Sequence, residues 1–448
     1  MARADWYRLD NVGKFYAAQA GSSAQTVFRF SAAMADAVDA EALQAALDGT
    51  VALFPSFNVC LRSGLFWHYL EPSREAPQVQ PEVLPICFGL HTGPRSVLFR
   101  VSWHERRINL EVSHMISDGR GSLEFFRVLV GLYAQARYGA PCEDVGDDAA
   151  ALEARRHQAE DSFSRHYDAR CATSTPSAKP FILPGLRDQA QPTFMEYHLS
   201  AGRVHQWARS MGASVTSLII AAVICAIRAE MPARDRSRPI RLDVPVDLRQ
   251  FFESTTMRNF FGLAFVSYTP GPSDEPLDAV AGQVQQQILA NCTADAVKGR
   301  MNRMVALEKN AALRLAPLFA KDLVLGLADR MAAREVTTTV SSLGRVTLPA
   351  SAAPFVRSVS VLTSTRGLNF VACTFDDDLS IGISTAYRSL AVVRSLCRIF
   401  ADQGIQGRID INQDAQQVDR RVREMRFEET VRQMGAVRKE RSGHAHLR

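Results

Sequence analysis

Apolar and polar residues along the chain follow two periods, one typical of strands and one typical of helices. Residues 108–113 alternate strictly between apolar and polar types, which predicts a half-buried strand. Residues 96–103 have the composition of a partner strand, and the polar HERR between the two segments predicts a hairpin. Apolar residues then recur at helical spacing over 120–137. Residues 114–119 are therefore expected in a turn between a strand and a helix.

The same mixture of elements continues through the rest of the chain. Strands are predicted at 25–34, 57–69 (a pair), 195–200, 240–249, 261–268, 336–342, 355–363, 368–375 and 379–384; helices are predicted at 39–55, 201–211, 214–231, 277–333 (two long ones) and 389–403. A polar stretch at 142–180 has the composition of a linker. We therefore expect an α/β protein with an N-terminal lobe at 1–175, a C-terminal lobe at 176–410 and a charged helical tail at 411–448.

Composition narrows the class of protein. The 448 residues are 47% hydrophobic and 22% charged, and a net charge of +5 is too weak for a nucleic-acid partner. The eight cysteines are scattered, which favours reduced, buried thiols. The N-terminus has no apolar signal segment, and the longest apolar run, 218–227, is half of what a bilayer requires. We expect a soluble, cytoplasmic protein.

The turn at 114–119 carries the candidate chemistry, in the sequence HMISDG. His114 ends a strand, and its near-neutral pKa suits it to take a proton from an alcohol or amine, although a single histidine is more often structural. Asp118 fits the N-cap of the helix that follows, or the support of the loop that aims His114. Gly119 fits a positive φ angle, or the need for open space beside His114. The three together favour a catalytic site.

At these residues the sequence resembles the chloramphenicol-acetyltransferase-like superfamily, which includes condensation domains and many acyltransferases. HMISDG matches the family's His-x-x-x-Asp-Gly motif. The segments PVDLRQFFESTTMRNFFG (245–262) and VSSLGRVTLP (340–349) resemble those of the bacterial alcohol acetyltransferase and polyketide-associated acyltransferase branch. The resemblance spans about 5–405. The sequence departs from the family at three places. Ser113 replaces the first of the two adjacent histidines of condensation domains, and the D-F-G-W-G motif of the plant-type enzymes is absent. Ser342 replaces the Asn that is commoner at this position in the bacterial branch.

The resemblance implies two lobes, each a mixed β-sheet flanked by helices, with an active-site tunnel between them. It implies an acyltransferase that moves an acyl group from acyl-CoA or an acyl-carrier-protein thioester to a small-molecule alcohol or amine. His114 would be the general base, and no metal or bound prosthetic group is required. Asp118, Gly119 and Arg249 would support the site, with Asp118 and Arg249 paired, and the expected substrate-binding residues are Asn259, Ser342 and Gly344.

Two alternatives stay open. A non-catalytic or peptide-condensing condensation-like module would dock a carrier protein instead. A lipid-modifying enzyme at a membrane surface is the other, because residues 313–331 are apolar enough to contact a bilayer. A buried helix is the favoured interpretation of that segment.

Overall fold

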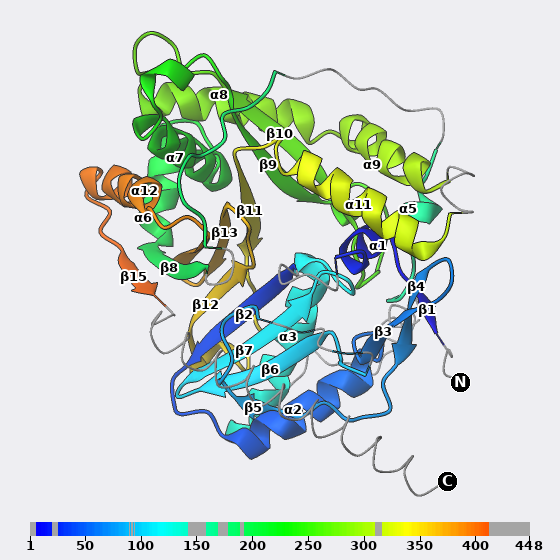
Figure 1. The fold of residues 1–448 in the computed structure, drawn as a ribbon. Helices are drawn as coiled ribbons and strands as arrows, with labels where there is room; N and C mark the ends of the chain where they lie inside the picture. The colour runs from blue at the N-terminus through cyan, green and yellow to red at the C-terminus, as the bar shows by residue number, and fades with distance from the viewer. Residues whose placement is uncertain are drawn as a thin grey trace, which may run out of the picture.

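The protein folds into two α/β lobes (Figure 1). Residues of both lobes line one large cavity. The computed structural model describes residues 6–19, 26–88, 90, 93, 95–141, 158–168, 178–188, 192–309 and 316–411. Most of the predicted linker, and the predicted tail from residue 412 onward, lie outside the described residues.

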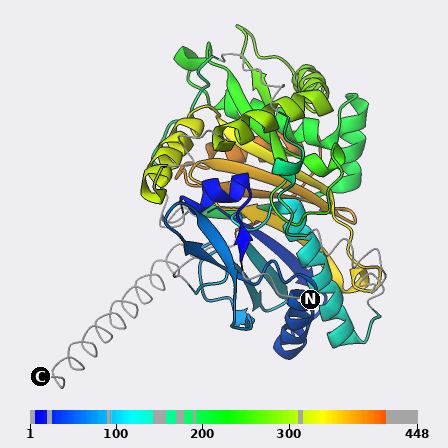
Figure 2. The ribbon, with the colours of Figure 1, turned by 90° about the vertical axis from the view of Figure 1, so that its right-hand side faces the viewer.

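The N-terminal lobe is built on a five-stranded sheet of order β12-β2-β7-β6-β5. Its strands are β2 (Val27–Met34), β5 (Gln80–Pro81), β6 (Phe99–His104), β7 (Arg107–Ser113) and β12 (Val356–Thr363). The predicted hairpin is confirmed, because β6 pairs antiparallel with β7. Helices α2 (Ala40–Leu53) and α3 (Gly119–Tyr138) pack on this sheet around one hydrophobic core (Figure 2). A smaller sheet, β1-β4-β3, joins Tyr7–Arg8, His68–Pro72 and Val59–Ser63.

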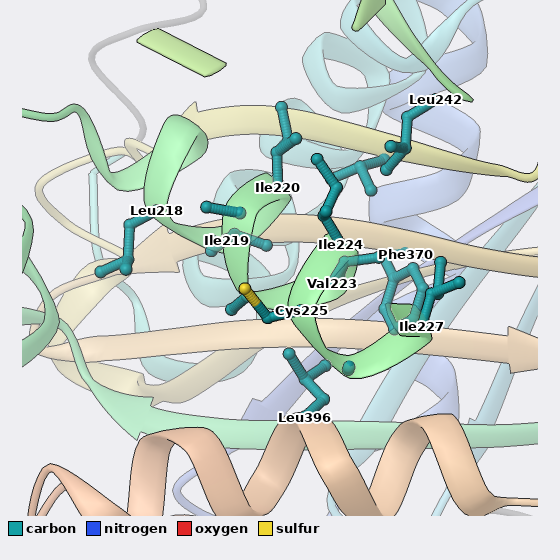
Figure 3. Packing of buried hydrophobic residues seen from close by; sticks show 14 of the residues in the cluster. Leu218, Ile219, Ile220, Val223, Ile224, Cys225, Ile227, Leu242, Phe370 and Leu396 are labelled. Atoms are coloured by element: carbon teal, nitrogen blue, oxygen red, sulfur yellow. The ribbon is translucent and has the colours of Figure 1, made fainter. Parts of the chain in front are cut away.

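The C-terminal lobe is built on a seven-stranded mixed sheet of order β10-β9-β11-β13-β14-β8-β15. The strands are β8 (Thr193–Ser200), β9 (Ile240–Asp247), β10 (Phe261–Tyr268), β11 (Thr338–Arg345), β13 (Leu368–Phe375), β14 (Asp378–Thr385) and β15 (Arg408–Ile411). The core helix α7 (Val215–Ala229) begins at Ser214, whose side chain caps it, and is apolar on every side. Figure 3 shows α7 packed on the sheet, with α12 (Ala391–Asp402) alongside it. Helices α6 (Ala201–Ser210) and α8 (Leu277–Asn291) complete this layer.

The strand β12 links the two lobes, because it comes late in the chain yet pairs with β2 of the first lobe. It also packs on β14 of the second lobe. A Cβ at Gly382 of β14 would lie 1.9 Å from the carbonyl oxygen of Val361 in β12. This close approach requires glycine, so one residue of β14 allows the lobes to meet here.

Two helix predictions for 277–333 need correction. The described residues of the segment form three helices, not two: α8, α9 (Ala294–Lys309) and α11 (Leu318–Ala332). The prediction that the helix at 313–331 is buried is also wrong for its described residues, because large apolar side chains of α11 are exposed. A helical apolar pattern indicates an amphipathic helix but not what covers its apolar face.

Among the described residues no single helix is long and apolar enough to cross a membrane. Only α6 and α7, taken together as a bent pair, have the length and apolar composition of a membrane span.

Candidate active site

His114 lies where β7 ends and faces the cavity between the lobes. Its backbone N–H donates to the carbonyl of Thr26 (2.9 Å). The imidazole stacks on the ring of Tyr16, with centroids 4.4 Å apart, and packs against Phe28 at 4.5 Å and Phe261 at 5.3 Å. Only 6% of the residue is exposed, yet it lines a cavity of about 1870 Å³ whose walls come from both lobes. The ring is thus fixed by packing and still reachable from the cavity.

The buried Asn259 fixes the tautomer of His114. The amide nitrogen Nδ2 of Asn259 donates to the carbonyl of His114 (3.0 Å) and to the carboxylate of Asp10 (3.1 and 3.2 Å). The amide oxygen Oδ1 therefore points at the ring and accepts from Nδ1 of His114 (2.7 Å). Because Nδ1 carries the proton in this arrangement, Nε2 keeps the lone pair.

Asp10 anchors this amide and begins helix α1 (Asn11–Ala17). Its Oδ1 accepts from the backbone N–H of Gly13 (2.6 Å), which makes it the N-cap, and its Oδ2 accepts from the backbone N–H of Asn259 (3.3 Å). Burial raises the pKa of Asp10 to about 6, against the opposing charge of Arg258 and these hydrogen bonds. One carboxylate thus connects α1 to the loop that holds Asn259.

Burial also sets the charge state of the two rings at the centre. It lowers the pKa of His114 to about 4, and the hydrogen bond that the ring donates to Asn259 and the charge of Asp118 oppose this only in part. Burial and then the nearby carboxylates, Asp243 first, raise the pKa of Tyr16. At neutral pH the site therefore contains an uncharged imidazole stacked on an uncharged phenol.

Asp118 supports the structure of the site, because both oxygens of its carboxylate accept hydrogen bonds from the protein. Its Oδ1 caps α3 by accepting from the backbone N–H of Gly121 (2.9 Å). Its Oδ2 accepts from Nη1 of Arg249 (2.9 Å) and from the backbone N–H of Phe260 (2.8 Å). The ion pair with Arg249 expected from the sequence is present, and it joins the two lobes beside His114.

Arg249 ties the loop after β9 into a fixed shape. Its guanidinium donates to Asp118, to Asp247 (2.9 Å) and to the carbonyls of Thr256 (2.9 and 3.0 Å) and Arg258 (2.7 Å). An arginine suits this role because its planar group carries several donors in fixed directions. Since Asn259 follows this loop, Arg249 places the amide that contacts His114.

Two glycines allow the lobes to approach at the start of α3. A Cβ on Gly119 would lie 3.1 Å from Cδ2 of Leu343, so the SSLGR turn packs directly on this residue. Gly119 has no positive φ angle, which leaves close packing as its role. A Cβ on Gly121 would lie 2.1 Å from the carbonyl oxygen of Met257, which also accepts from the hydroxyl of Ser117 (2.6 Å).

The three expected substrate-binding residues fall in different places. Ser342 and Gly344 line the cavity, on either side of a bulge in β11 where Gly344 adopts a positive φ of 68°. Asn259 does not line the cavity; it lies behind His114 because its amide is consumed by Asp10 and the histidine. The structure thus gives Asn259 a position suited to orienting the ring, in place of contact with substrate.

Sequence patterns did not reveal Asp10, Tyr16, Phe28 or Phe261, all of which contact His114 or its partner. Asp10 could have been recognised as the start of a helix from its position before a short apolar pattern. Its contact with Asn259 joins residues 249 positions apart, and no local signal indicates that.

One further polar cluster could resemble a metal site: ligand atoms of Glu196, His198 and Asp410 lie within 4.8 Å of one another. Arg107 already binds both oxygens of Glu196 (2.6 and 2.8 Å), and Asp378 accepts from Nδ1 of His198 (2.9 Å). Although burial opposes it, Asp378 and Glu196 raise the pKa of His198 to about 9. The cluster is therefore an ion-pair network that joins β7 to β8.

Comparisons with known proteins concern the family and the fold. Residues 199–384 match the family described as "Phthiocerol/phthiodiolone dimycocerosyl transferase C-terminus". No curated protein sequence matches the chain.

Solved structures match over most of the chain. Polyketide synthase associated protein 5 from Mycobacterium tuberculosis has 14% identity and a TM-score of 0.57, covering 89% of this chain and 99% of its own. TRI101 of F. sporotrichioides, complexed with coenzyme A and T-2, has 12% identity and a TM-score of 0.58 over 91% and 99%. The first condensation domain of the calcium-dependent antibiotic synthetase has 16% identity and a TM-score of 0.58 over 89% and 97%. The chain therefore has the two-lobed fold of the condensation-domain and chloramphenicol-acetyltransferase-like superfamily, as its motif predicted.

Proposed function

We propose that the protein is an acyltransferase that moves an acyl group from a thioester donor to a hydroxyl or amine acceptor. One observation carries the proposal: His114 lines a large cavity between the lobes with Nδ1 bound to Asn259, so that Nε2 is the basic nitrogen. The match of 199–384 to a family of acyl transferases supports the same class of reaction.

In this mechanism Nε2 of His114 takes the proton of the acceptor O–H or N–H as the acceptor attacks the thioester carbonyl. The carbonyl becomes a tetrahedral oxyanion. When the oxyanion collapses, the C–S bond breaks and the imidazolium returns its proton to the leaving thiolate. The low pKa of His114 keeps the imidazole ready as a base at neutral pH and makes the imidazolium a strong acid for this last step.

Ser342 is our candidate for stabilising the oxyanion. It lies in the SSLGR turn, which packs on Gly119 at the start of α3, and it lines the same cavity as His114. A hydroxyl donor held by the fold suits a charge that develops only in the transition state.

The donor is an acyl-CoA or an acyl carrier protein in this proposal. The structures with the same fold include TRI101 with coenzyme A and a starter condensation domain of rhizomide synthetase with C8-CoA. The cavity of about 1870 Å³ is large enough for an acyl chain together with an acceptor.

A condensation-like module that docks a carrier protein is the second candidate, because condensation domains share the fold at similar TM-scores. Ser113, the residue before His114, favours the acyltransferase over the condensation-like module. Condensation domains usually carry two adjacent histidines, and here Ser113 precedes His114.

The test is thiol release from acyl-CoA of several chain lengths, with a mixed panel of alcohols and amines and with mass analysis of the products. We expect release that depends on an acceptor and is lost in His114→Ala. Transfer only from an aminoacyl carrier protein would favour the condensation module. Transfer that persists unchanged in His114→Ala would refute the mechanism.

A further inference from the structure

Asp243 is a carboxylate in the cavity wall that no step of the proposed acyl transfer uses. It lies on β9, where it is paired with Phe265 of β10 and with Thr339 of β11, and all three residues line the cavity. Alternate residues of a strand face the same side, and Pro245 and Asp247 follow Asp243 along the cavity wall. A molecule in the cavity can therefore reach this acidic side chain.

Asp243 differs from the other buried or half-buried carboxylates of the cavity wall, each of which pairs with an arginine. These pairs are Asp118 and Asp247 with Arg249, both at 2.9 Å, and Asp329 with Arg366. Asp243 forms no ion pair with a described residue, and its buried Oδ1 has no hydrogen-bond partner among them. Because the terminal torsion of an aspartate is broad, either carboxylate oxygen can turn toward the cavity.

The cation that acts on Asp243 does not pair with it. Arg241 lies two residues earlier on β9, and its guanidinium lies over the ring of Phe265, 4.5 Å from the ring centre. Burial raises the pKa of Asp243 to about 6, and hydrogen bonds, that of Thr339 first, and the charge of Arg241 oppose this only in part. At neutral pH Asp243 is therefore mostly ionised, without a partner of opposite charge among the described residues.

One small molecule can span the distance between Asp243 and His114. Phe261 packs against the ring of His114 at 5.3 Å, and it lies four residues before Phe265, the strand partner of Asp243. Four residues of a strand span roughly 13 Å. The ring of Tyr16, which stacks on His114 at 4.4 Å, is close to both: after burial, the charge of Asp243 does most to raise the pKa of Tyr16.

An ionised carboxylate without a partner costs free energy in an apolar wall, and a bound cation offsets that cost. We propose that Asp243 binds an ammonium group of the acceptor, while another group of the same molecule, a hydroxyl or an amine, reacts at His114. The acceptor would then be an amino alcohol or a diamine whose two groups lie on the order of 10 Å apart. The inference rests on the proposed function for the reaction at His114, and it adds a charged group to what the cavity selects.

Other parts of the substrates fit this place less well. An aliphatic acyl chain would leave the carboxylate unpaired, and a phosphate of an acyl-CoA donor would be repelled by its charge. A neutral hydroxyl can donate a hydrogen bond to Asp243, but an ammonium group adds the attraction of opposite charges. An ammonium group is therefore the occupant that Asp243 favours.

The test is calorimetric titration of the full chain with three linear compounds of equal chain length. Aminooctanol, octanediol and octanol share a hydroxyl at one end and carry an ammonium, a hydroxyl or a methyl group at the other. We expect wild type to bind aminooctanol about tenfold more tightly than either of the other two. Asp243→Asn keeps the size of the side chain and removes its charge, so the three compounds should bind this variant within about twofold of one another.

Glu335→Gln is the matched control for the loss of a negative charge. Glu335 also lines the cavity, but it is exposed and lies outside β9. This variant should keep the preference of wild type for aminooctanol. Thermal unfolding without ligand checks the fold of both variants, and Asp243→Asn should melt no lower than wild type, because it loses an unpaired charge. The order of the three compounds in wild type tests the proposal without any variant.

Several outcomes would overturn the proposal. Wild type that binds aminooctanol no more tightly than octanediol would do so, and so would a preference that persists in Asp243→Asn. Weaker binding of coenzyme A by Asp243→Asn would also overturn it, since Asp243 would then contact the donor. Because titration needs no turnover, a preference for aminooctanol without acyl transfer would refute only the proposed function. Acyl transfer without the preference would refute only the ammonium site.

Discussion

The amide oxygen of Asn259 lies 2.7 Å from Nδ1 of His114, and the amide nitrogen of the same side chain lies 3.0 Å from the carbonyl of His114. One amide therefore holds both the ring and the backbone of the histidine. Its orientation is set by Asp10, which accepts from the amide nitrogen. The tautomer needed for a base at Nε2 is thus built into the fold before any substrate binds.

Replacing Asn259 should therefore impair the base without removing it. We expect Asn259→Leu to lower kcat by ~10–10²-fold, because Nδ1 of His114 loses its acceptor and both tautomers become accessible. NMR of ring nitrogens labelled with ¹⁵N should show Nδ1–H as the main tautomer in wild type and a mixture in the variant. An unchanged kcat together with an unchanged tautomer would refute the role given to Asn259.

Removing the proposed base, His114, should have a larger effect. We expect His114→Ala to fold and to lower acyl transfer by ~10²–10⁴-fold, the usual contribution of one general base. The fall should appear in kcat more than in KM, because the proposed role of His114 is in the chemical step, although the residue is also part of the cavity wall. A variant with near wild-type kcat would exclude His114 as the base.

The low pKa of His114 predicts a pH dependence of stability. The folded protein binds a proton at His114 only below about pH 4, whereas the unfolded chain does so below about 6.5. Between these values the unfolded state binds more protons, so the contribution of His114 to the free energy of unfolding should decrease by about 1.4 kcal/mol for each unit by which the pH is lowered. Asp10 and Asp243 contribute with the opposite sign in the same range, because burial raises the pKa of each to about 6, but they are present in both wild type and His114→Gln. Urea unfolding at several pH values should therefore show this slope in the difference between wild type and His114→Gln.

The turn that carries His114 could be predicted from the sequence because its signals are local. The alternation of β7, the cap at Asp118 and the helical spacing of α3 all lie within residues 107–138. The pairing of Asp118 with Arg249 also followed, since a buried carboxylate requires a cation and the family resemblance suggested which one.

Other features depend on how distant segments meet, and the sequence does not encode that locally. The role of Asn259 arises because the loop tied by Arg249 folds back behind His114. The entry of β12 into the first lobe's sheet depends on strand order, which apolar alternation cannot specify. The apolar pattern at 313–331 predicted a helix but not its surroundings, and among the described residues large apolar side chains of α11 are exposed.

The pair Asp118 and Arg249 should couple strongly in stability, since their side chains are 5% and 13% exposed. We expect Asp118→Ala to cost about 3–5 kcal/mol by stranding the guanidinium and removing the cap of α3. In a double-mutant cycle with Arg249→Ala the coupling should be ~0.5–3 kcal/mol. Asp247→Ala is the control, because Asp247 also contacts Nη1 but is 22% exposed and should couple less. Strict additivity for Asp118 and Arg249 would contradict the structural role.

A last prediction concerns Gly121, where the start of α3 meets the loop before Asn259. An added Cβ would lie 2.1 Å from the carbonyl oxygen of Met257, so the loop has to move in Gly121→Ala. Because Met257 precedes Asn259 by two residues, the shift should disturb the amide that orients His114. We expect a loss of stability of ~1–3 kcal/mol, as for overpacking. We also expect kcat to fall by a larger factor than KM changes.

The control for this prediction is Gly282→Ala in α8. Gly282 has no neighbouring atom within 4 Å of an added Cβ, so alanine should raise stability by about 0.5–1 kcal/mol through better helix propensity. Thermal unfolding and kinetics of both variants would therefore separate the close contact from the general effect of replacing a helical glycine. If Gly121→Ala matched Gly282→Ala in stability and activity, the contact between α3 and the loop would not hold His114 in place.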